Sequence, residues 1–367
     1  MCEDAPAAEL FLEWDSSLEN LAFDGHGHLY LSDSGRDQVF RVGPDGDSSM
    51  ALDRGGNGLV WGPDDRLYVA APGGGAYDIL RSTDANASAF EAYVQGVPTY
   101  NGLAFDGAGN LYASDDNLQP PATPPDVIRI PRADPAKWEA WTDLTGADGI
   151  AYDPVRDVLY TDIVADQSSP ILRISPVDKA VADVVAYLSF GLATLEPNVH
   201  EPQGDPTNSI PKGPDDLTVG PDGLLYVAGH VSGEVIRLDT ATGDACILAS
   251  GLEEPSSLRF ARGFGEHGGK LFVSTWGGNG VTGLGQTTAG MPPAGKVWMF
   301  DLGFTGGPTA FPQAPSNSTS QTDDGNCAFC GDEVVSDEPK KDTPGLPAFA
   351  ALLVLAIAAI ATRRPGR

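Results

Sequence analysis

A short pattern of apolar and polar positions recurs along the chain. Two copies read ENLAFDGHGHLYL at 19–31 and NGLAFDGAGNLYA at 101–113, and four others begin at residues 57, 148, 215 and 256. Each copy opens on a polar residue, runs through a short apolar stretch, turns on Gly, Asp or Pro, and returns through a run such as Leu-Tyr-Val. Apolar runs this short, bounded by turn residues, are typical of β-strands. The pattern therefore predicts a repeat fold with one equivalent polar position at the opening of each copy.

The spacing of the copies predicts how many strands each unit holds. Counted from residues 19, 57, 101, 148, 215 and 256, successive copies start 38, 44, 47, 67 and 41 residues apart, which leaves room for four short strands. No long segment has a 3.6-residue apolar period, so we expect few helices. We predict an all-β fold, a six-bladed β-propeller over residues 8–303, because radial repetition protects the sheet edges.

The two ends of the repeat region predict how the ring closes. The last copy has only three strands of its own, and the run ELFLEW at 9–14 belongs to no copy. We expect this run to supply the outer strand of the sixth blade. Residues 1–7 then form a short N-terminal extension.

The C-terminal part of the chain has a different composition. Residues 304–345 are rich in Gly, Pro, Ser, Thr and Asp, which predicts a disordered linker. The apolar run LPAFAALLVLAIAAIA is followed by TRRPGR, so we predict a membrane anchor or sorting tail at 346–367, with the arginines on the cytoplasmic side. The propeller is then extracellular, at the cell surface, although no signal peptide is recognisable in this chain.

Charge and cysteine content limit the classes of partner. The net charge is −29, from 51 acidic and 22 basic residues, which argues against nucleic acid or an anionic membrane surface as a ligand. We expect a monomer that binds a small lactone or ester, or a ligand at the cell surface. Four cysteines are too few for a disulfide scaffold. Cys2 is predicted to be a free thiol or a lipidated first residue, and the Cys327/Cys330 pair a local disulfide or two thiols rather than a zinc site.

The polar opening residues are expected to meet near the propeller axis, because the innermost strand of each blade starts there on one face. They are Glu19, Asn57, Asn101, Asp148, Asp215 and Ser256. Each carries a side-chain oxygen, and calcium prefers six to eight oxygen ligands. Without a cation, the three carboxylates would repel one another. We predict one divalent cation, with calcium favoured, bound by Glu19, Asn101, Asp148 and Asp215. The alternative is that the Asn-Gly and Asp-Gly pairs only form tight turns.

Longer loops are predicted on the same face as these residues. They span 71–77, 115–125, 164–169 and 276–294, and an insert covers 189–213. Loops built over one end of a rigid scaffold are common binding sites, so we expect Asn57, His200 and His230 to contact a substrate. For the two histidines, a role in surface structure is the alternative. His26 and His28 fall on the opposite face and are expected to be inert.

Four motifs resemble those of the six-bladed gluconolactonase/regucalcin (SMP-30) family and, more distantly, of paraoxonases and NHL-repeat propellers. They are Glu19 before an apolar strand, Asn101-Gly-Leu, Asp148-Gly-Ile and Pro-Asp215-Asp-Leu. The resemblance implies that Glu19, Asp148 and Asp215 bind a divalent cation and that Asn101 positions water or substrate. Asp148 stands where the family usually has Asn, and Thr99 stands where gluconolactonases often carry Arg.

The sequence leaves two functions open. The first is a metal-dependent hydrolase of a lactone or related ester, in which the cation polarises the carbonyl, Asp215 or Asp148 activates water and Asn101 assists. The second is a non-catalytic, NHL-like propeller that binds a protein or small ligand, with a purely structural cation. A quinone-dependent sugar dehydrogenase is a third propeller activity, but no basic cluster suits the carboxylates of its cofactor.

Overall fold

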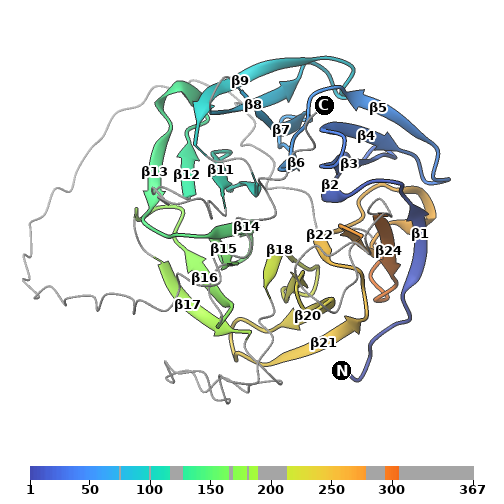
Figure 1. The fold of residues 1–367 in the computed structure, drawn as a ribbon. Coiled ribbons are helices and arrows are strands. Elements are labelled where there is room, and N and C mark those ends of the chain that lie inside the picture. The colour runs from blue at the N-terminus through green and yellow to red at the C-terminus, as the bar shows by residue number, and fades with distance from the viewer. Residues whose placement is uncertain are drawn as a thin grey trace, which may run out of the picture.

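The chain folds into six four-stranded antiparallel sheets arranged around a central axis (Figure 1). The computed structural model describes residues 1–73, 76–98, 101–115, 127–164, 168–179, 182–188, 213–277 and 294–305. These residues contain β-strands and two short 3-10 helices, Pro135–Lys137 and Gly265–His267. The predicted all-β, six-bladed propeller is confirmed.

Each blade is numbered here in chain order, and its strands run from the axis outward (Figure 1). Blade 1 holds β2 (Leu18–Phe23), β3 (Leu29–Asp33), β4 (Gln38–Val42) and β5 (Ser48–Leu52). Blade 2 holds β6 (Leu59–Trp61), β7 (Leu67–Pro72), β8 (Tyr77–Ser82) and β9 (Phe90–Val97). Blade 3 holds β10 (Leu103–Phe105), β11 (Leu111–Ser114), β12 (Val127–Ile130) and β13 (Glu139–Thr142).

The remaining blades follow the same order. Blade 4 holds β14 (Ala147–Asp153), β15 (Val158–Ile163), β16 (Pro170–Ile174) and β17 (Ala182–Tyr187). Blade 5 holds β18 (Pro214–Val219), β19 (Leu225–Gly229), β20 (Glu234–Leu238) and β21 (Ala245–Ser250). Blade 6 holds β22 (Pro255–Phe260), β23 (Leu271–Thr275), β24 (Lys296–Phe300) and, from the other end of the chain, β1 (Glu9–Glu13).

The N-terminal strand closes the ring, as predicted. β1 pairs antiparallel with β24, so that Leu12 lies opposite Val297 and Glu13 opposite Lys296. Blade 6 is thus the one sheet among the described strands that joins the two ends of the repeat region. Its backbone hydrogen bonds convert an open row of blades into a closed ring.

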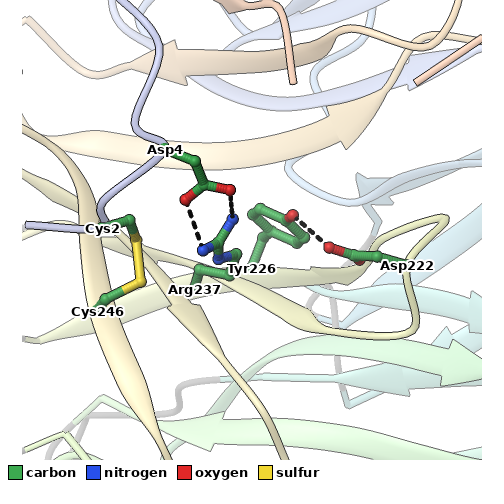
Figure 2. The surroundings of a disulfide bond; sticks show 6 residues. All are labelled: Cys2, Asp4, Asp222, Tyr226, Arg237 and Cys246. Carbon is green, nitrogen blue, oxygen red and sulfur yellow. Dashed lines mark hydrogen bonds and ion pairs between the residues drawn. A yellow bond between two sulfur atoms is a disulfide. The ribbon is translucent and has the colours of Figure 1, made fainter. Parts of the chain in front are cut away.

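A disulfide fastens the N-terminal extension to blade 5, which the sequence analysis did not predict. Cys2 is bonded to Cys246 on β21 across a sequence separation of 244 residues, and the backbone N–H of Cys2 donates to the carbonyl of Ile247 at 2.8 Å. Beside it, both terminal guanidinium nitrogens of Arg237 bind the carboxylate of Asp4, at 2.8 and 2.9 Å (Figure 2). The prediction of a free or lipidated Cys2 was wrong, because nothing in its local sequence shows that the extension lies along β21.

Apolar side chains fill the spaces between neighbouring blades. Tyr68 of blade 2, for example, packs edge-on against Phe105 of blade 3, with ring centroids 4.9 Å apart. The aromatic residue of the repeated return strand is fully buried in four blades, as Tyr30, Tyr112, Tyr226 and Phe272. The repeat therefore places its largest apolar side chain in the interior, where it holds adjacent blades together.

Several predictions concern segments outside the described residues. These segments are the linker from residue 306 onward, the 346–367 tail, the Cys327/Cys330 pair and most of the predicted long loops. Within the described part of the chain, no helix has the length and apolar character needed to cross a membrane.

Candidate functional site

The openings of four inner strands contain irregularities that change the direction of the side chains. The register of the inner pair shifts between Leu18 and Leu21, Ala147 and Ile150, Pro214 and Asp216, and Pro255 and Ser257. Such a β-bulge inserts a residue that does not follow the alternation of sheet faces, and bulges often redirect side chains at functional sites. The predicted polar openings of blades 1, 4, 5 and 6 lie within these bulges.

Hydroxyl groups on the second strands connect these openings across blade boundaries. Ser32 donates to the carbonyl of Asn57 at 3.1 Å, Ser274 donates to the carbonyl of Glu19 at 3.0 Å, and Ser114 donates to the carbonyl of Asp148. In each case the acceptor is the opening residue of the next blade. The three hydroxyls are fully buried. They fix the backbone at the strand openings. Each serine is the fourth residue of its return run (Leu-Tyr-x-Ser or, in blade 6, Leu-Phe-x-Ser), a regularity that is visible in the repeat.

One polar cluster joins blades 1, 3 and 4. The side-chain amide of Asn101 donates to the carboxylate of Asp148, and the amide of Asn20 donates to the side-chain oxygen of Asn101 at 3.4 Å. All three side chains are buried. The structure therefore brings the predicted Asn101 and Asp148 together and adds Asn20, which the sequence analysis missed.

A second cluster joins blades 1, 5 and 6. The indole N–H of Trp276 donates to Glu19 Oε2 at 2.6 Å, and His230 Nδ1 lies 3.0 Å from Asp215 Oδ2. The rings of His230 and Trp276 meet edge-on, with centroids 6.2 Å apart. His230 and Asp215 keep 24% and 12% of their side-chain surface exposed, so neither side chain is completely buried by the described residues.

The electrostatic potential of this second cluster is strongly negative. Burial alone lowers the pKa of the His230 imidazole, but the charge and hydrogen bond of Asp215, together with the charges of Glu254 and Glu19, raise that pKa to about 9. His230 is then an imidazolium at neutral pH. The same potential would attract any other cation.

Glu254 is a further member of this region that the sequence analysis missed. Its side chain is fully buried, and neither carboxylate oxygen has a hydrogen-bond partner among the described residues. Its φ of 55° is also unusual for a residue other than glycine. The backbone holds this conformation because the Glu254 carbonyl accepts a hydrogen bond from the N–H of Trp276 at 2.8 Å.

Other predicted positions have different surroundings. Ser256 is buried and donates to the carbonyl of Leu18 at 2.9 Å, and Asn57 contributes its carbonyl to the bond from Ser32. His200 lies outside the described residues. At the opposite end of the inner strands, His28 binds Asp24 within its own turn at 2.7 Å, as expected for a structural residue.

The predicted cation ligands carry the oxygen donors that calcium prefers, and in this structure their carboxylates contact protein side chains. Among the described residues, no three His, Cys, Asp or Glu side chains are grouped so that they could hold an ion. Trp276 binds Glu19, His230 binds Asp215 and Asn101 binds Asp148. The buried, unpartnered oxygens of Glu254 and the negative potential at His230 nevertheless suit a hard cation.

Comparison with known proteins identifies the fold. No protein-family model matches the chain, and no curated protein matches it by sequence. Among solved structures, a gluconolactonase from Xanthomonas campestris is 18% identical, with a TM-score of 0.56 over 80% of this chain and 89% of that one. Regucalcin from Agrobacterium tumefaciens, a calcium-binding protein, is 13% identical, with a TM-score of 0.58 over 83% and 97%.

The same fold also occurs in a protein with different chemistry. The aldose sugar dehydrogenase from Streptomyces coelicolor, in its PQQ-bound form, is 16% identical, with a TM-score of 0.53 over 81% of this chain and 100% of that one. Identities this low establish the shared architecture and leave the reaction to the residues of the site. The chain has the six-bladed β-propeller of gluconolactonase and regucalcin structures, as its motifs predict.

Proposed function

We propose that the ring of opening residues hydrolyses a lactone or a related ester. The observation that carries this proposal is the partly exposed His230–Asp215 pair, which lies beside Glu19 and Trp276 at the end of the propeller axis. Ester hydrolysis needs a carboxylate or other base to activate water and a positive group to stabilise the oxyanion. Both kinds of group are present, on adjacent blades.

The residues divide into two roles. Asp215 Oδ2 lies 3.0 Å from Nδ1 of His230 as an ion-pair partner, and Nε2–H of the imidazolium would donate to the substrate carbonyl oxygen as negative charge develops there. Asp148 is the candidate base, and the amide of Asn101 fixes the orientation of its carboxylate. Glu19, held by Trp276, maintains the negative potential that keeps His230 protonated.

The proposal includes one divalent cation, with calcium favoured by the oxygen donors. In the cation-bound form, Glu19, Asn101, Asp148 and Asp215 would hold the ion in place of their present side-chain partners. The bound ion would then polarise the substrate carbonyl as a Lewis acid, the role that His230 has in its absence. The calcium-binding regucalcin of the same fold supports this part of the proposal.

Hydrolysis of a panel of lactones and aryl esters tests the reaction. We expect His230→Gln and Asp148→Asn each to lower kcat/KM about 100-fold or more, the usual contribution of a group in acid–base or oxyanion catalysis. His28→Gln is the matched control, because His28 also binds an Asp but at the other end of the inner strands, and it should stay within about twofold of wild type. A panel that shows no turnover, with or without added calcium, would exclude this reaction.

Removal of metal separates the cation from the rest of the proposal. After treatment with a chelator, activity should fall and should return on addition of calcium. Activity that survives chelation but is lost in His230→Gln would show that the protein groups suffice and that the cation assignment is wrong.

A non-catalytic binding propeller is the second candidate. It is favoured by one observation, namely that the three carboxylates already have protein partners: Glu19 and Asp148 each accept a side-chain hydrogen bond, and Asp215 forms an ion pair with His230. Calcium-dependent thermal stabilisation without turnover of any substrate in the panel would support this second function.

We also propose that the protein acts outside the cytoplasm, anchored at the cell surface through residues 346–367. The Cys2–Cys246 disulfide supports this location, because such bonds persist in oxidising compartments. Thiol labelling of the native protein in intact and lysed cells tests it: Cys2 and Cys246 should resist labelling in both, and labelling of both cysteines only after lysis would contradict it.

A further inference from the structure

The central channel contains a largely apolar cavity at the end opposite the ring. It has a volume of about 390 Å³, which lies within the range of small-molecule sites. Inner strands of all six blades contribute to its wall through Ala22, Leu59, Leu103, Ile150, Leu217 and Phe260. Its lining extends to the short turns between first and second strands, at Pro154 and Gly220. The cavity therefore reaches the face of the propeller that the ring does not use.

Among the described residues of this lining, three side chains carry a charge, and two of them form ion pairs. Arg259 donates to Asp216 Oδ2 at 2.6 Å, and both side chains are largely buried. Asp153 Oδ2 accepts a hydrogen bond from Arg156 of the same turn at 2.6 Å. The protein itself compensates these charges, so a charged ligand would find no complementary group at either pair.

Arg262, the third charged residue of the lining, lies near acidic groups. Its Nη2 donates to the backbone carbonyl of Asp24 at 3.3 Å. Burial lowers the pKa of its guanidinium, and the charges of Asp65 and Asp24 oppose that effect. A ligand cation would be repelled by the guanidinium, and a ligand anion by the two aspartates. This end of the cavity therefore favours neither sign of charge.

The apolar part of the wall suits a hydrocarbon better than it suits water. A buried water molecule needs two to four polar partners, whereas an apolar cavity of about 150 Å³ in a protein core binds benzene. The cavity in this propeller has more than twice that volume, which suits a body of two fused rings. Thr218 and Thr305 also line it, so a single hydroxyl group on a ligand has polar groups in the same wall.

We propose that this cavity binds a neutral, apolar ring compound, of the class of bicyclic alcohols and hydrocarbons. The ring body lies against the inner strands, and burial of its surface supplies the affinity. An ion of the same shape would lose its hydration without gaining a partner, because the charged side chains of the lining are compensated by the protein. The site is separate from the proposed hydrolase, which uses the ring residues His230, Asp215 and Asp148.

Calorimetric titration of the full-length protein with three ligands that share one ring body tests the proposal. They are naphthylmethanol, which is neutral, naphthoate, which is an anion, and naphthylmethylammonium, which is a cation. We expect saturable binding of the alcohol that is at least tenfold tighter than binding of either ion. The proposal is overturned if the alcohol does not bind saturably or if either ion binds as tightly as the alcohol.

Val60→Trp tests whether the alcohol binds in this cavity. Val60 is half-buried in the lining on β6, so a larger side chain there takes up part of the space. We expect the variant to bind naphthylmethanol at least tenfold more weakly, and a cooperative melting curve would show that it is folded. Val184→Trp, the same substitution on the exposed outer strand β17, is the matched control and should leave the affinity within twofold.

His230→Gln tests whether the cavity and the ring bind separately. This variant should bind naphthylmethanol like wild type, because His230 lies at the other end of the inner strands. If His230→Gln removes binding, or if folded Val60→Trp binds the alcohol as tightly as wild type, the ligand lies outside the cavity and the proposal is wrong.

Discussion

The two ends of the six inner strands come from the same repeat but have different chemistry. At one end, which we call the ring end, lie the polar residues that open the inner strands. Several of these strands begin with bulges, and polar side chains bond from one blade to another, as in Asn101 with Asp148. At the short-turn end, Asp side chains bond mainly within their own turn, although Asp65 of blade 2 also contacts His26 of blade 1 at 2.7 Å. Asp106 Oδ1, for example, accepts hydrogen bonds from the N–H of Ala108 at 2.9 Å and of Asn110 at 2.8 Å.

This difference shows why an abundance of carboxylates does not by itself locate a site. The turn carboxylates satisfy local backbone donors, so each turn would form in any repeat with the same sequence. Two of the three carboxylates at the strand openings depend on partners from other blades: Glu19 of blade 1 on Trp276 of blade 6, and Asp148 of blade 4 on Asn101 of blade 3. Asp215 pairs with His230 of its own blade. Where several blades position one side chain, a substitution in any of them can change its position. The ring end is therefore better suited to specific chemistry than the turns are.

Removal of the Cys2–Cys246 disulfide is expected to have the largest effect on the unfolding free energy. It should affect both ends of the inner strands alike, so it serves as a reference for the other variants. The Cys2–Cys246 bond closes a loop of 244 residues, and loss of such a bond usually costs about 2–5 kcal/mol of unfolding free energy because the unfolded chain gains freedom. We expect Cys2→Ser/Cys246→Ser to lower the denaturant midpoint accordingly. At low denaturant, hydrolytic activity per folded molecule should not change.

Reductant supplies the control for this variant. It should lower the midpoint of the wild type and leave that of the double variant unchanged. An unchanged midpoint of the reduced wild type would show that the closing strand alone holds the ring.

A smaller effect, confined to the ring end, is expected from Ser114→Ala. The variant leaves the buried carbonyl of Asp148 without the hydroxyl of Ser114, and an unsatisfied buried acceptor costs about 1–3 kcal/mol. Activity should fall as well, because the backbone of Asp148 is then less firmly placed. Ser232→Ala is the control: its hydroxyl donates to Gly229 within one turn, and its removal should cost less than about 0.5 kcal/mol. Equal losses in denaturant titrations of the two variants would contradict a special role for bonds between blades.

A still smaller effect, confined to the other end, is expected from Asp222→Ala. Asp222 is exposed and accepts a hydrogen bond from the N–H of Leu224 at 3.1 Å. It also accepts one from the hydroxyl of Tyr226 at 2.9 Å (Figure 2). Loss of these bonds should cost about 1 kcal/mol of unfolding free energy, with activity at the ring unchanged. A large fall in kcat/KM in the folded variant would show that the two ends are coupled.

The sequence predicts the repeated parts of the molecule and fails where the blades meet. Four-stranded blades, the closing strand at Glu9–Glu13 and the polar openings all follow from a pattern that each copy repeats. The partners of those openings do not, because Trp276 and Glu254 become neighbours of His230 only after the ring has closed. Cys2 lies outside the repeat, so no periodic signal assigns it to Cys246.

Asp162 shows how a change within the repeated pattern alters the contacts between blades. In the fourth place of the return strand, Asp162 stands where other blades have Ser32, Ser114 and Ser274. Its Oδ1 accepts the N–H of Gly149 at 3.0 Å, just as Ser32 accepts the N–H of Asn20 at 2.7 Å. Its Oδ2 has no hydrogen-bond partner among the described residues, whereas the serines donate to the next blade. A carboxylate can donate only if it holds a proton.

Asp162→Ser should therefore stabilise the protein slightly at neutral pH. Burial, with the nearby charges of Asp216 and Asp215, raises the pKa of Asp162 well above its ordinary value of 3.8. The folded state then holds this proton more tightly than the unfolded state, and the stability contribution is greatest below pH 3.8 and declines as pH rises toward the folded-state pKa. Serine supplies the hydroxyl found at this place in blades 1, 3 and 6, and it does not titrate. We therefore expect Asp162→Ser to raise the unfolding free energy by about 1 kcal/mol at pH 7 and to weaken its decline with pH. Denaturant titrations between pH 4 and pH 8 measure both, with Asp183→Ser on the exposed edge of the same blade as the control. Destabilisation by Asp162→Ser at pH 7 would instead show that the ring requires the charge of Asp162, as a site built for a cation does.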